Sequence, residues 1–349
     1  MRTPRVAVII VSYNALPILQ KCLPTVVRTT WPNLEIVFAD NNSTDGSSEW
    51  IAGQFPGIRI IRHPENWLFS RGNNEAIREV TADYIVLLNN DVAVPEYWLR
   101  PLVSFAERNP SFAALQPKIL QFSQRDHFEY AGACGGYLDR LGYPLARGRI
   151  FDHTEQDAGQ YDMPVRIDWA SGAAMLLRRS ALDSIGLLDE TFGLHMEEID
   201  LCWRLRRSGH EIGVVPESEV YHIGGATLPR ENERKLYYNI RNSLLMLYKN
   251  LPPGHFSAVL LLRIILDHSV ALAWLLGGKW RRTRAVIRGY VDANRKRSNY
   301  SQPTEATALP SYRGLILLEY LLMGRRRFSD LPDKRLSLNH VTAPPDSTS

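Results

Sequence analysis

Strand patterns and helix patterns alternate through the first hundred residues of the chain. Short apolar runs, each ending in polar residues, are separated by stretches with helical character. This order predicts stacked βαβ units and therefore an α/β fold, a Rossmann-like, mostly parallel sheet with helices on both faces. The expected strands lie near 5–11, 34–39, 58–62 and 84–89, and the expected helices lie near 16–29, 47–54, 72–80 and 96–108.

The pattern weakens between residues 113 and about 164, where glycine and aromatic residues predict irregular hairpins or loop. Long irregular segments in compact enzymes often form substrate lids. Regular structure is expected again as a strand over 169–179, a helix over 197–208 and strands near 211–215 and 218–222.

The character of the chain changes after Arg230. Helices are expected over 235–249 and 315–323, with a mostly apolar stretch over 256–276 between them. Arg263, Asp267 and His268 interrupt that stretch. Arg263 and Asp267 are four positions apart, so they share a helix face and could pair. No uninterrupted run reaches the roughly 20 apolar residues that span a bilayer.

Length and composition limit the organisation. A chain of 349 residues with 45% hydrophobic residues can bury a sizeable core. Three scattered cysteines, Cys22, Cys134 and Cys202, suit neither a disulfide framework nor a zinc site, and favour a reduced cytosolic compartment. Residues 1–5 lead directly into a strand pattern, without a signal-peptide hydrophobic region. The predicted units are an α/β domain over 1–229 (halves of about 1–112 and 113–229), a basic amphipathic helical extension over 230–330 and a disordered tail over 331–349.

The net charge of +4 conceals an asymmetry. From Arg230 onward there are about 20 Lys and Arg against about 9 Asp and Glu, which leaves about 21 against 28 before it. The basic extension suggests an anionic partner surface. Nucleic acid is disfavoured, because the basic residues alternate with apolar runs rather than with stacking aromatics. An anionic membrane leaflet fits the pattern; packing on the α/β domain or in a dimer interface fits nearly as well.

Polar side chains follow three of the expected strands. Asn89, Asn90 and Asp91 follow the fourth strand, Asp40 follows the second, and Ser12 ends the first. Parallel sheets bind ligands beyond the carboxyl ends of their strands, so we expect one composite site for a polar, anionic ligand. Asp91 could bind Mg²⁺ or Mn²⁺, which prefer oxygen ligands and keep waters and substrate phosphates. Ordinary strand-end turns are the alternative.

Further candidate residues lie outside these strand ends. Arg71 and Asn74 lie near a predicted helix start, where backbone N–H groups attract anions. Glu197, Glu198 and Asp200 crowd another helix start, which suits a general base because neighbouring carboxylates raise one another's pKa. An acidic first helical turn is the alternative. His222 could coordinate metal or be structural, and Trp169, Ser171 and Gly172 could line a sugar site or pack the core.

Seven segments, taken in order, resemble family-2 glycosyltransferases with the GT-A fold, especially their bacterial rhamnosyltransferase-like branch. The segments are V-A-V-I-I-V-S-Y-N, F-A-D-N-N-S-T-D-G, R-G-N-N, L-L-N-N-D-V, W-A-S-G-A-A-M, M-E-E-I-D-L-C-W-R and H-I-G-G-A-T, and they span roughly residues 5–227. Each segment is weak alone, and their order makes the match specific.

The resemblance implies inverting transfer of a sugar from a nucleotide-diphosphate-sugar, with dTDP-rhamnose as one option, to a glycan or lipid-linked acceptor in cell-surface polysaccharide synthesis. In that pattern Asp91 binds a divalent cation at the donor's pyrophosphate, His222 is the second protein ligand, and Glu198 deprotonates the acceptor hydroxyl. The implied donor-binding set is Ser12, Tyr13, Asn14, Asp40, Asn42, Arg71, Asn74, Asn89 and Asn90. The enzyme would be cytoplasmic, at the inner face of the cell membrane.

Two departures from the family pattern stand out. The family's Asp-x-Asp metal motif reads Asn89-Asn90-Asp91 here, so one carboxylate remains. Its Glu-Asp pair reads Glu197-Glu198, so the expected base is one methylene longer. Two other classes remain as alternatives: a nucleotidyltransferase, which normally has a Gly-rich phosphate loop near its amino terminus, and a non-catalytic carbohydrate-binding or assembly protein. The sequence leaves the donor sugar, the acceptor and the oligomeric state open.

Overall fold

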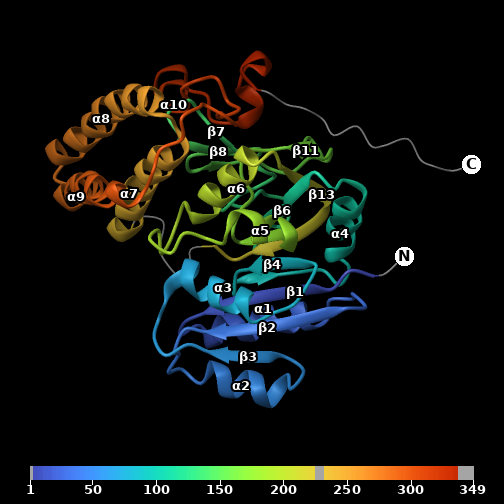
Figure 1. Ribbon diagram of the computed structural model, residues 1–349. Helices are drawn as coiled ribbons and strands as arrows, with labels where there is room; N and C mark the ends of the chain where they lie inside the picture. Colours follow the sequence, from blue (N-terminus) through green and yellow to red (C-terminus); the bar gives the residue numbers. More distant parts are fainter. Residues whose placement is uncertain (1–2, 225–231, 337–349) are drawn as a thin grey trace, which may run out of the picture.

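The computed structural model describes residues 3–224 and 232–336 of the chain. A nine-stranded sheet runs through the molecule in the order β11-β13-β6-β12-β4-β1-β2-β3, with β5 paired to β13 (Figure 1). Its strands are β1 (Val6–Ser12), β2 (Leu34–Asp40), β3 (Arg59–Arg62), β4 (Tyr84–Leu88), β5 (Val92–Ala93), β6 (Phe112–Gln121), β11 (Val165–Arg166), β12 (Ala174–Arg178) and β13 (Glu211–His222). Strands β1 to β4 pair in parallel, and β12 runs antiparallel to both β4 and β6. The predicted α/β class is confirmed.

Helices cover both faces of this sheet, as predicted. The helices of the α/β domain are α1 (Leu16–Val27), α2 (Ser47–Gln54), α3 (Leu68–Arg78), α4 (Leu99–Arg108), α5 (Arg179–Ile185) and α6 (Glu197–Arg207). Alternate residues of β1 face opposite sides of the sheet. Ala7 and Ile9 belong to one apolar core with α3, α5 and α6, whereas Val8 and Ile10 belong to a second core with α1, α2 and α4.

Strand β6 is the main element that sequence patterning missed. It is buried at nine of its ten positions, although Gln116 and Lys118 interrupt the apolar pattern. The structure satisfies both side chains: Gln116 Nε2 donates to two backbone carbonyls, and Lys118 Nζ lies 2.7 Å from Asp157 Oδ2 and 2.6 Å from Asp162 Oδ1. A central strand was therefore missed because two of its buried positions are polar residues whose hydrogen bonds are satisfied within the protein.

The expected irregular segment after β6 is a packed unit rather than an open lid. It contains a second, four-stranded sheet of β7 (Gly136–Leu138), β8 (Pro144–Ala146), β9 (Arg149–Ile150) and β10 (His153–Thr154). Residues of three of these strands, Tyr137, Leu145 and Ile150, are fully buried in the first core. The two strands expected near 211–222 form one strand, β13, whose register with β6 shifts between Val215 and Glu219.

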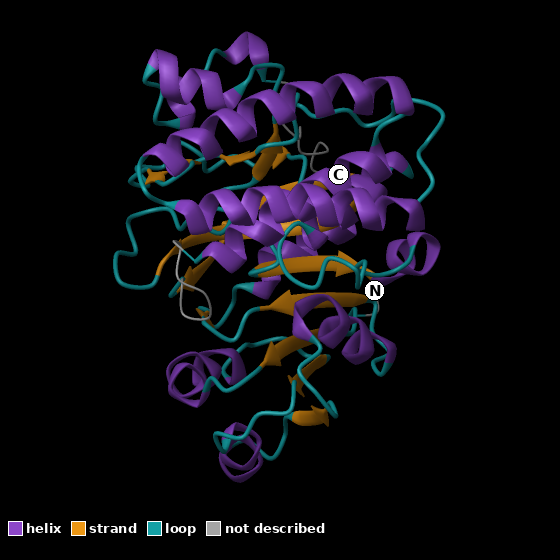
Figure 2. Cartoon of the chain, turned by 90° about the vertical axis from the view of Figure 1, so that its left-hand side faces the viewer, coloured by secondary structure: helices purple, strands orange, loops and turns teal. Residues whose placement is uncertain are grey.

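The extension is helical and gathers at the end of the molecule opposite α2 and β3 (Figures 1 and 2). It contains α7 (Glu233–Asn250), α8 (Pro253–Leu276), α9 (Trp280–Lys296) and α10 (Ile316–Met323), with short 3-10 helices η1 (Arg297–Asn299), η2 (Phe328–Asp330) and η3 (Asp333–Arg335). The sequence indicated only a basic run where α9 lies. The expected boundary at 229/230 and residues 337–349 of the expected tail lie outside the described residues, but residues 331–336 include η3 and a β-bridge between Leu336 and Tyr312.

Helix α8 both confirms and corrects the expectation for its sequence. The predicted Arg263–Asp267 pair is present, with Nε and Oδ2 3.0 Å apart and both side chains buried. By length and composition, however, the helix is long and apolar enough to cross a membrane, contrary to the expectation that its charges rule this out. Only 17% of its most apolar window is buried.

Candidate active site at the carboxyl edge of the sheet

The parallel strands bring their terminal polar residues together. In the β1–β2 register, Ser12 lies opposite Asp40. Strand β4 pairs with the other side of β1, and the turn after it returns Asn90 toward Ser12, so that Asn90 Nδ2 donates to Ser12 Oγ at 2.8 Å. The three strand ends that sequence patterning selected thus meet at one edge of the sheet.

A histidine between two carboxylates extends this edge. His222 Nε2 lies 2.9 Å from Asp91 Oδ1, and His222 Nδ1 lies 2.9 Å from Glu129 Oε2. All three side chains are buried. Burial opposes the charged imidazole, but the two carboxylates outweigh it and raise the pKa of His222 to about 10. Burial likewise opposes the charge on Glu129, but contact with His222 holds the pKa of its carboxyl below the usual range.

Sequence patterning missed Glu129. It lies in the loop after β6, in a segment with no recognisable spacing, and only the fold brings it to His222. No group of three or more His, Cys, Asp and Glu in ranges 3–224 and 232–336 could hold a metal ion alone. Asp91 and His222 nevertheless suit Mg²⁺ or Mn²⁺, which are often held by few protein ligands and completed by water and phosphate. A carboxylate on the second imidazole nitrogen is also the usual support of a metal-bound histidine.

The loop after β2 is a tightly bonded turn around Asp40. Asp40 accepts hydrogen bonds from the Ser43 backbone N–H at 2.8 Å and from the Ser48 hydroxyl. Asn14 and Asn42 adopt left-handed φ angles of 47° and 65°, which asparagine tolerates better than most residues. Tyr13 beside them is exposed. Asp45 Oδ1 accepts from Ser47 N at 3.1 Å directly before α2, whose N-cap residue is Gly46.

Two residues expected near a helix start lie inside a helix. Helix α3 begins at Leu68, so Arg71 and Asn74 are in its first and second turns. Arg71 is partly exposed and lies 4.0 Å from the centre of the Trp67 ring. Asn74 is buried, and its amide pairs with both the carbonyl and the N–H of Leu188. Asn74 is therefore engaged in packing, whereas the partly exposed Arg71 lies over Trp67 and 3.8 Å from Glu65 Oε1.

The acidic helix start is built on a strained turn. His195 and Met196, directly before α6, have left-handed φ angles of 66° and 72°. Within the described part of the chain, Oε2 of Glu197 and Oε2 of Glu198 have no hydrogen-bond partner. Burial raises the pKa of Glu198 to about 7, and burial together with the Glu198 charge raises the pKa of Glu197 well above its ordinary value. Buried carboxyls with free oxygens are suited to accept a proton.

Gly172 and Ala173 lie between this helix start and the polar residues that follow β4. Asn89 N donates to Ala173 O at 2.9 Å. The neighbouring Gly172 lies against Glu198, since a Cβ built on Gly172 would be 3.7 Å from Glu198 Cβ and 3.1 Å from the Phe69 ring. The strand-end residues and the acidic pair are therefore linked through consecutive contacts.

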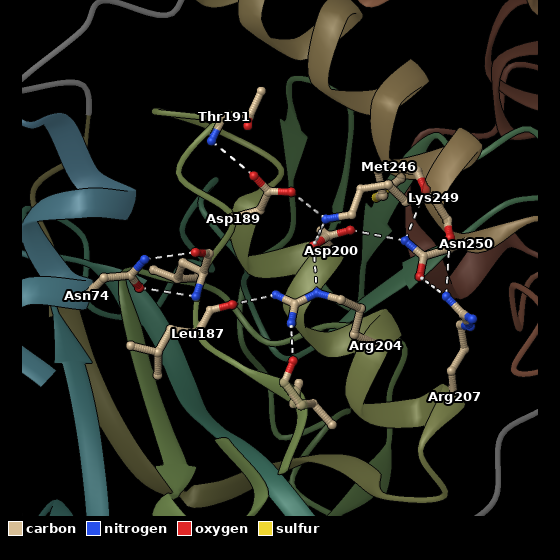
Figure 3. A network of polar contacts seen from close by, with 12 residues as sticks. Asn74, Leu187, Asp189, Thr191, Asp200, Arg204, Arg207, Met246, Lys249 and Asn250 are labelled. Atoms are coloured by element: carbon tan, nitrogen blue, oxygen red, sulfur yellow. Dashed lines mark hydrogen bonds and ion pairs between the residues drawn. The ribbon is translucent and has the colours of Figure 1, made fainter. Parts of the chain in front are cut away.

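Asp200 lies in a different environment from its two acidic neighbours. It is fully buried, and its Oδ2 lies 2.9 Å from Arg204 Nε and 2.8 Å from Lys249 Nζ (Figure 3). Its Oδ1 accepts from Asn250 Nδ2 at 3.1 Å. Both oxygens are thus occupied, so the catalytic role expected for Asp200 stays a prediction that these contacts do not favour.

Of the three residues that could line a sugar site, Trp169 and Ser171 are engaged in core contacts, whereas Gly172 lies beside the acidic helix start. Trp169 is buried in the core, its ring packs on Gly136, and its Nε1 donates to Tyr137 O at 3.0 Å. Ser171 is also buried, and its N–H donates to Gln116 Oε1 at 2.8 Å. These contacts favour the packing alternative for Trp169 and Ser171, whereas Gly172 lies beside Glu198. The expected strand over 169–179 begins only at Ala174.

Comparisons with known proteins identify the family of the chain. Residues 7–186, about half of the chain, match the sequence model of "Glycosyl transferase family 2". "Uncharacterized protein y4gI" of Sinorhizobium fredii is 27% identical over 242 residues, which cover 66% of this chain and 26% of that protein. N-acetylglucosaminyl-diphospho-decaprenol L-rhamnosyltransferase of Mycobacterium tuberculosis is 28% identical over 234 residues, which cover 62% of this chain and 75% of the relative. The chain thus spans about a quarter of the first relative's length and three quarters of the second's.

Solved structures show the same architecture. GalNAc-T7 with UDP, GalNAc and Mn²⁺ superposes with a TM-score of 0.56 at 15% identity, over 73% of this chain and 49% of that chain. S. aureus TarS 1-349 gives a TM-score of 0.55 at 14% identity, over 83% and 80% of the two chains. Identities this low show the fold alone, which is GT-A.

Proposed function

Because the chain belongs to glycosyltransferase family 2, in its rhamnosyltransferase-like branch, we propose that it transfers a sugar with inversion from a nucleotide-diphosphate-sugar to an acceptor hydroxyl. The observation that carries the proposal is the Glu198 carboxyl, with one oxygen unpaired and its pKa raised to about 7. The contacts through Gly172 and Ala173 support this role, because they run from Glu198 to the strand ends that would hold the donor.

In the proposed reaction, a Glu198 oxygen takes the proton of the acceptor hydroxyl. The acceptor oxygen forms a bond to the anomeric carbon on the face opposite the leaving group, while the bond from that carbon to the diphosphate oxygen breaks. The nucleoside diphosphate leaves with the electron pair. Ser12, Tyr13 and Asp40 would hold the nucleobase and ribose, with Asn14, Asn42, Asn89 and Asn90 around them.

Asp91 and His222 would hold a divalent cation, with Glu129 fixing the orientation of the imidazole. When bound, the cation supplies positive charge that stabilises the departing diphosphate. The likeness to a structure that contains Mn²⁺ and UDP supports a metal and a nucleotide. Arg71, partly exposed over Trp67, would add a fixed positive charge toward the anionic donor.

The identity of the M. tuberculosis relative favours a deoxyhexose donor such as dTDP-rhamnose and a lipid-linked acceptor for cell-surface glycan synthesis. An enzyme with a lipid-linked acceptor must act at a membrane surface. We propose that this surface is the cytoplasmic face of the cell membrane.

The exposed side of α8 supports a membrane partner. Leu261, Ile265, Leu272 and Leu276 are spaced four or seven positions apart on the helix and are all exposed. The next helix begins with a basic segment, residues 279–284, that suits anionic lipid headgroups. On the opposite side, Arg263 is buried between the α/β domain and α7. It donates to Leu141 O at 3.1 Å and to Ser243 Oγ at 3.0 Å. A helix anchored in this way would lie on a bilayer rather than cross it.

A panel of UDP-, GDP- and dTDP-sugars with Mn²⁺ or Mg²⁺ tests the proposed activity. The expected result is release of one nucleoside diphosphate, slow with water and faster with a lipid-linked sugar acceptor. Thermal stabilisation by a nucleotide sugar without any turnover would favour a non-catalytic binding protein. Release of pyrophosphate from a nucleoside triphosphate and a sugar phosphate would favour a nucleotidyltransferase.

A further inference from the structure

The loop before α6 depends on outside contacts for its shape. Non-glycine residues hold left-handed backbone conformations only where their surroundings fix them, and His195 and Met196 do so in succession. Glu197 and Glu198 follow at once, so whatever fixes the loop over residues 191–195 also decides where the two carboxyls point.

Asn242 of α7 provides the most concentrated of these contacts. Its side-chain nitrogen Nδ2 lies 3.1 Å from Phe192 O, 2.8 Å from Leu194 O and 2.7 Å from His195 O. An amide NH₂ has two hydrogens, so one N–H is shared between two of these carbonyls. Asn242 is fully buried, which makes each of these bonds costly to lose.

Arg241 fixes the orientation of that amide. Its Nε donates to Asn242 Oδ1 at 2.7 Å, so the oxygen end of the amide has its own donor and the NH₂ end faces the loop. The same guanidinium donates through Nη2 to Thr191 O at 3.0 Å and to Phe192 O at 2.7 Å. Two consecutive residues of α7 thus act as one unit.

Helix α3 completes the support from the other side. Gly193 O accepts from the backbone N–H groups of Phe69 and Ser70, at 3.2 Å each, in the first turn of α3. Every carbonyl from residue 191 to residue 195 therefore accepts a hydrogen bond from α3 or α7. The loop joins the donor side of the sheet to the extension.

We infer that Asn242 is a positioning residue of the active site, which places Glu198 by holding the carbonyls on the amino-terminal side of the left-handed turn. The inference rests on the proposed role of Glu198 as the base. It assigns part of the catalytic geometry to α7, which lies beyond the residues that match the family.

Asn242→Ala and the milder Asn242→Ser test the inference, with Asn250→Ala as the matched control. Asn250 is another fully buried asparagine of α7, and it bonds to Asp200 on α6 rather than to the loop. For each variant we would measure kcat and KM for the consumed nucleotide sugar, the kcat–pH profile, the melting temperature and amide hydrogen exchange of peptides covering residues 191–198.

We expect Asn242→Ala to lower kcat at least tenfold with KM for the donor changed less than threefold. A looser loop would admit water to Glu198, and hydration lowers the pKa of a carboxyl. The acidic limb of the kcat–pH profile should therefore shift to lower pH by about one unit. Exchange in residues 191–198 should accelerate. Asn250→Ala should lower the melting temperature similarly while keeping kcat within threefold and the pH limb in place.

Distinct results would overturn the inference. An unchanged kcat and pH limb in both Asn242 variants, or an equal kcat loss in Asn250→Ala, would reduce Asn242 to a structural role. If Asn242→Ala fails to fold, Asn242→Ser decides by the same criteria. If the wild type consumes no nucleotide sugar, the proposed function fails. Unchanged amide exchange over residues 191–198 in the Asn242 variants would separately show that Asn242 does not hold this loop.

Discussion

Asp91 and His222 are 131 positions apart in the chain, yet Oδ1 of Asp91 lies 2.9 Å from Nε2 of His222. The pairing of β5 with β13 produces the contact, because it sets Val92 opposite His222 and so carries Asp91 alongside. Glu129 holds the other imidazole nitrogen. The three residues form a hydrogen-bonded unit, in which we propose Asp91 and His222 as cation ligands and Glu129 as their support.

Loss of His222 should therefore weaken metal binding. We expect His222→Ala to reduce the affinity for Mn²⁺, in the presence of saturating UDP, GDP or dTDP, by about tenfold or more. Glu129→Gln, which removes only the support, should weaken it by about 10- to 100-fold. Titration followed by Mn²⁺ electron paramagnetic resonance gives both values. His127→Ala, at a histidine whose side chain pairs with Asp126 near the surface, is the control. Wild-type affinity in His222→Ala would exclude the proposed ligand.

Activity should rise with pH through neutrality. The proposed base must be ionised to accept a proton, and burial raises the pKa of Glu198 to about 7. Turnover should thus fall about tenfold for each pH unit below this value. Glu198→Gln should lose about 10²- to 10⁴-fold in kcat. Glu217→Gln, at an exposed position on β13, should retain wild-type kcat. Near wild-type turnover in Glu198→Gln, with donor binding intact, would refute the assignment.

The same carboxyl should reduce stability at high pH. A carboxyl whose pKa is raised by folding favours the folded state fully below its unfolded value, near 4.3, and that contribution is lost as the pH rises through about 7. Glu198→Gln removes the penalty. Its melting temperature should exceed that of the wild type by about 2 °C or more at pH 8 and match it near pH 4.5. An equal shift at both pH values would attribute the effect to packing.

Much of the fold was predictable because its strands are short, apolar and bounded by turns. Strands β1, β2 and β4, and the polar residues at their ends, all follow from local pattern and from the geometry of parallel sheets. Strand β6 escaped prediction because Gln116 and Lys118 are buried with partners that come from residues 132–162. No local window contains that information.

Candidate site residues were predictable where they follow a recognisable strand. Asp91 and His222 were selected separately, and the fold joins them. Glu129 and Asn242 carry no local signal, since each acts through a contact more than 40 positions away along the chain. Asp200 was predicted beside the proposed base Glu198 as part of one acidic helix start, but the local sequence does not show that Lys249 and Asn250 of α7 contact its carboxylate.

Asp200 should matter for stability more than for chemistry. Lys249→Met leaves the buried Asp200 carboxylate with one cationic partner fewer, and breaking a buried pair typically costs about 3–5 kcal/mol of unfolding free energy. The loss should be smaller in Asp200→Asn combined with Lys249→Met, because position 200 then carries no charge; Asp189, which also contacts Lys249 at 2.6 Å, loses that partner in both the single Lys249→Met and the double variant. Urea denaturation of both single variants and the double variant gives the coupling. Asp200→Asn should retain kcat within about tenfold; a loss as large as that of Glu198→Gln would return Asp200 to the catalytic group.

The apolar side of α8 should decide membrane binding. The double variant Leu272→Glu/Leu276→Glu removes two of the most exposed apolar side chains of α8. It also adds two negative charges, which an anionic surface would repel. We expect the double variant to lose flotation with vesicles containing 30% phosphatidylglycerol, and the wild type to lose it as salt rises toward 0.5 M, since screening shortens the reach of the basic segment.

Val27→Glu, on an exposed apolar residue of α1, should leave flotation unchanged. If the wild type floats equally with neutral and anionic vesicles, the charge argument fails. If it does not float at all and the α8 variant instead changes its mass in solution from dimer to monomer, the face is an interface between copies of the chain. Resistance of the bound wild type to extraction by high salt and carbonate would instead support a helix that crosses the bilayer, against the anchoring by Arg263.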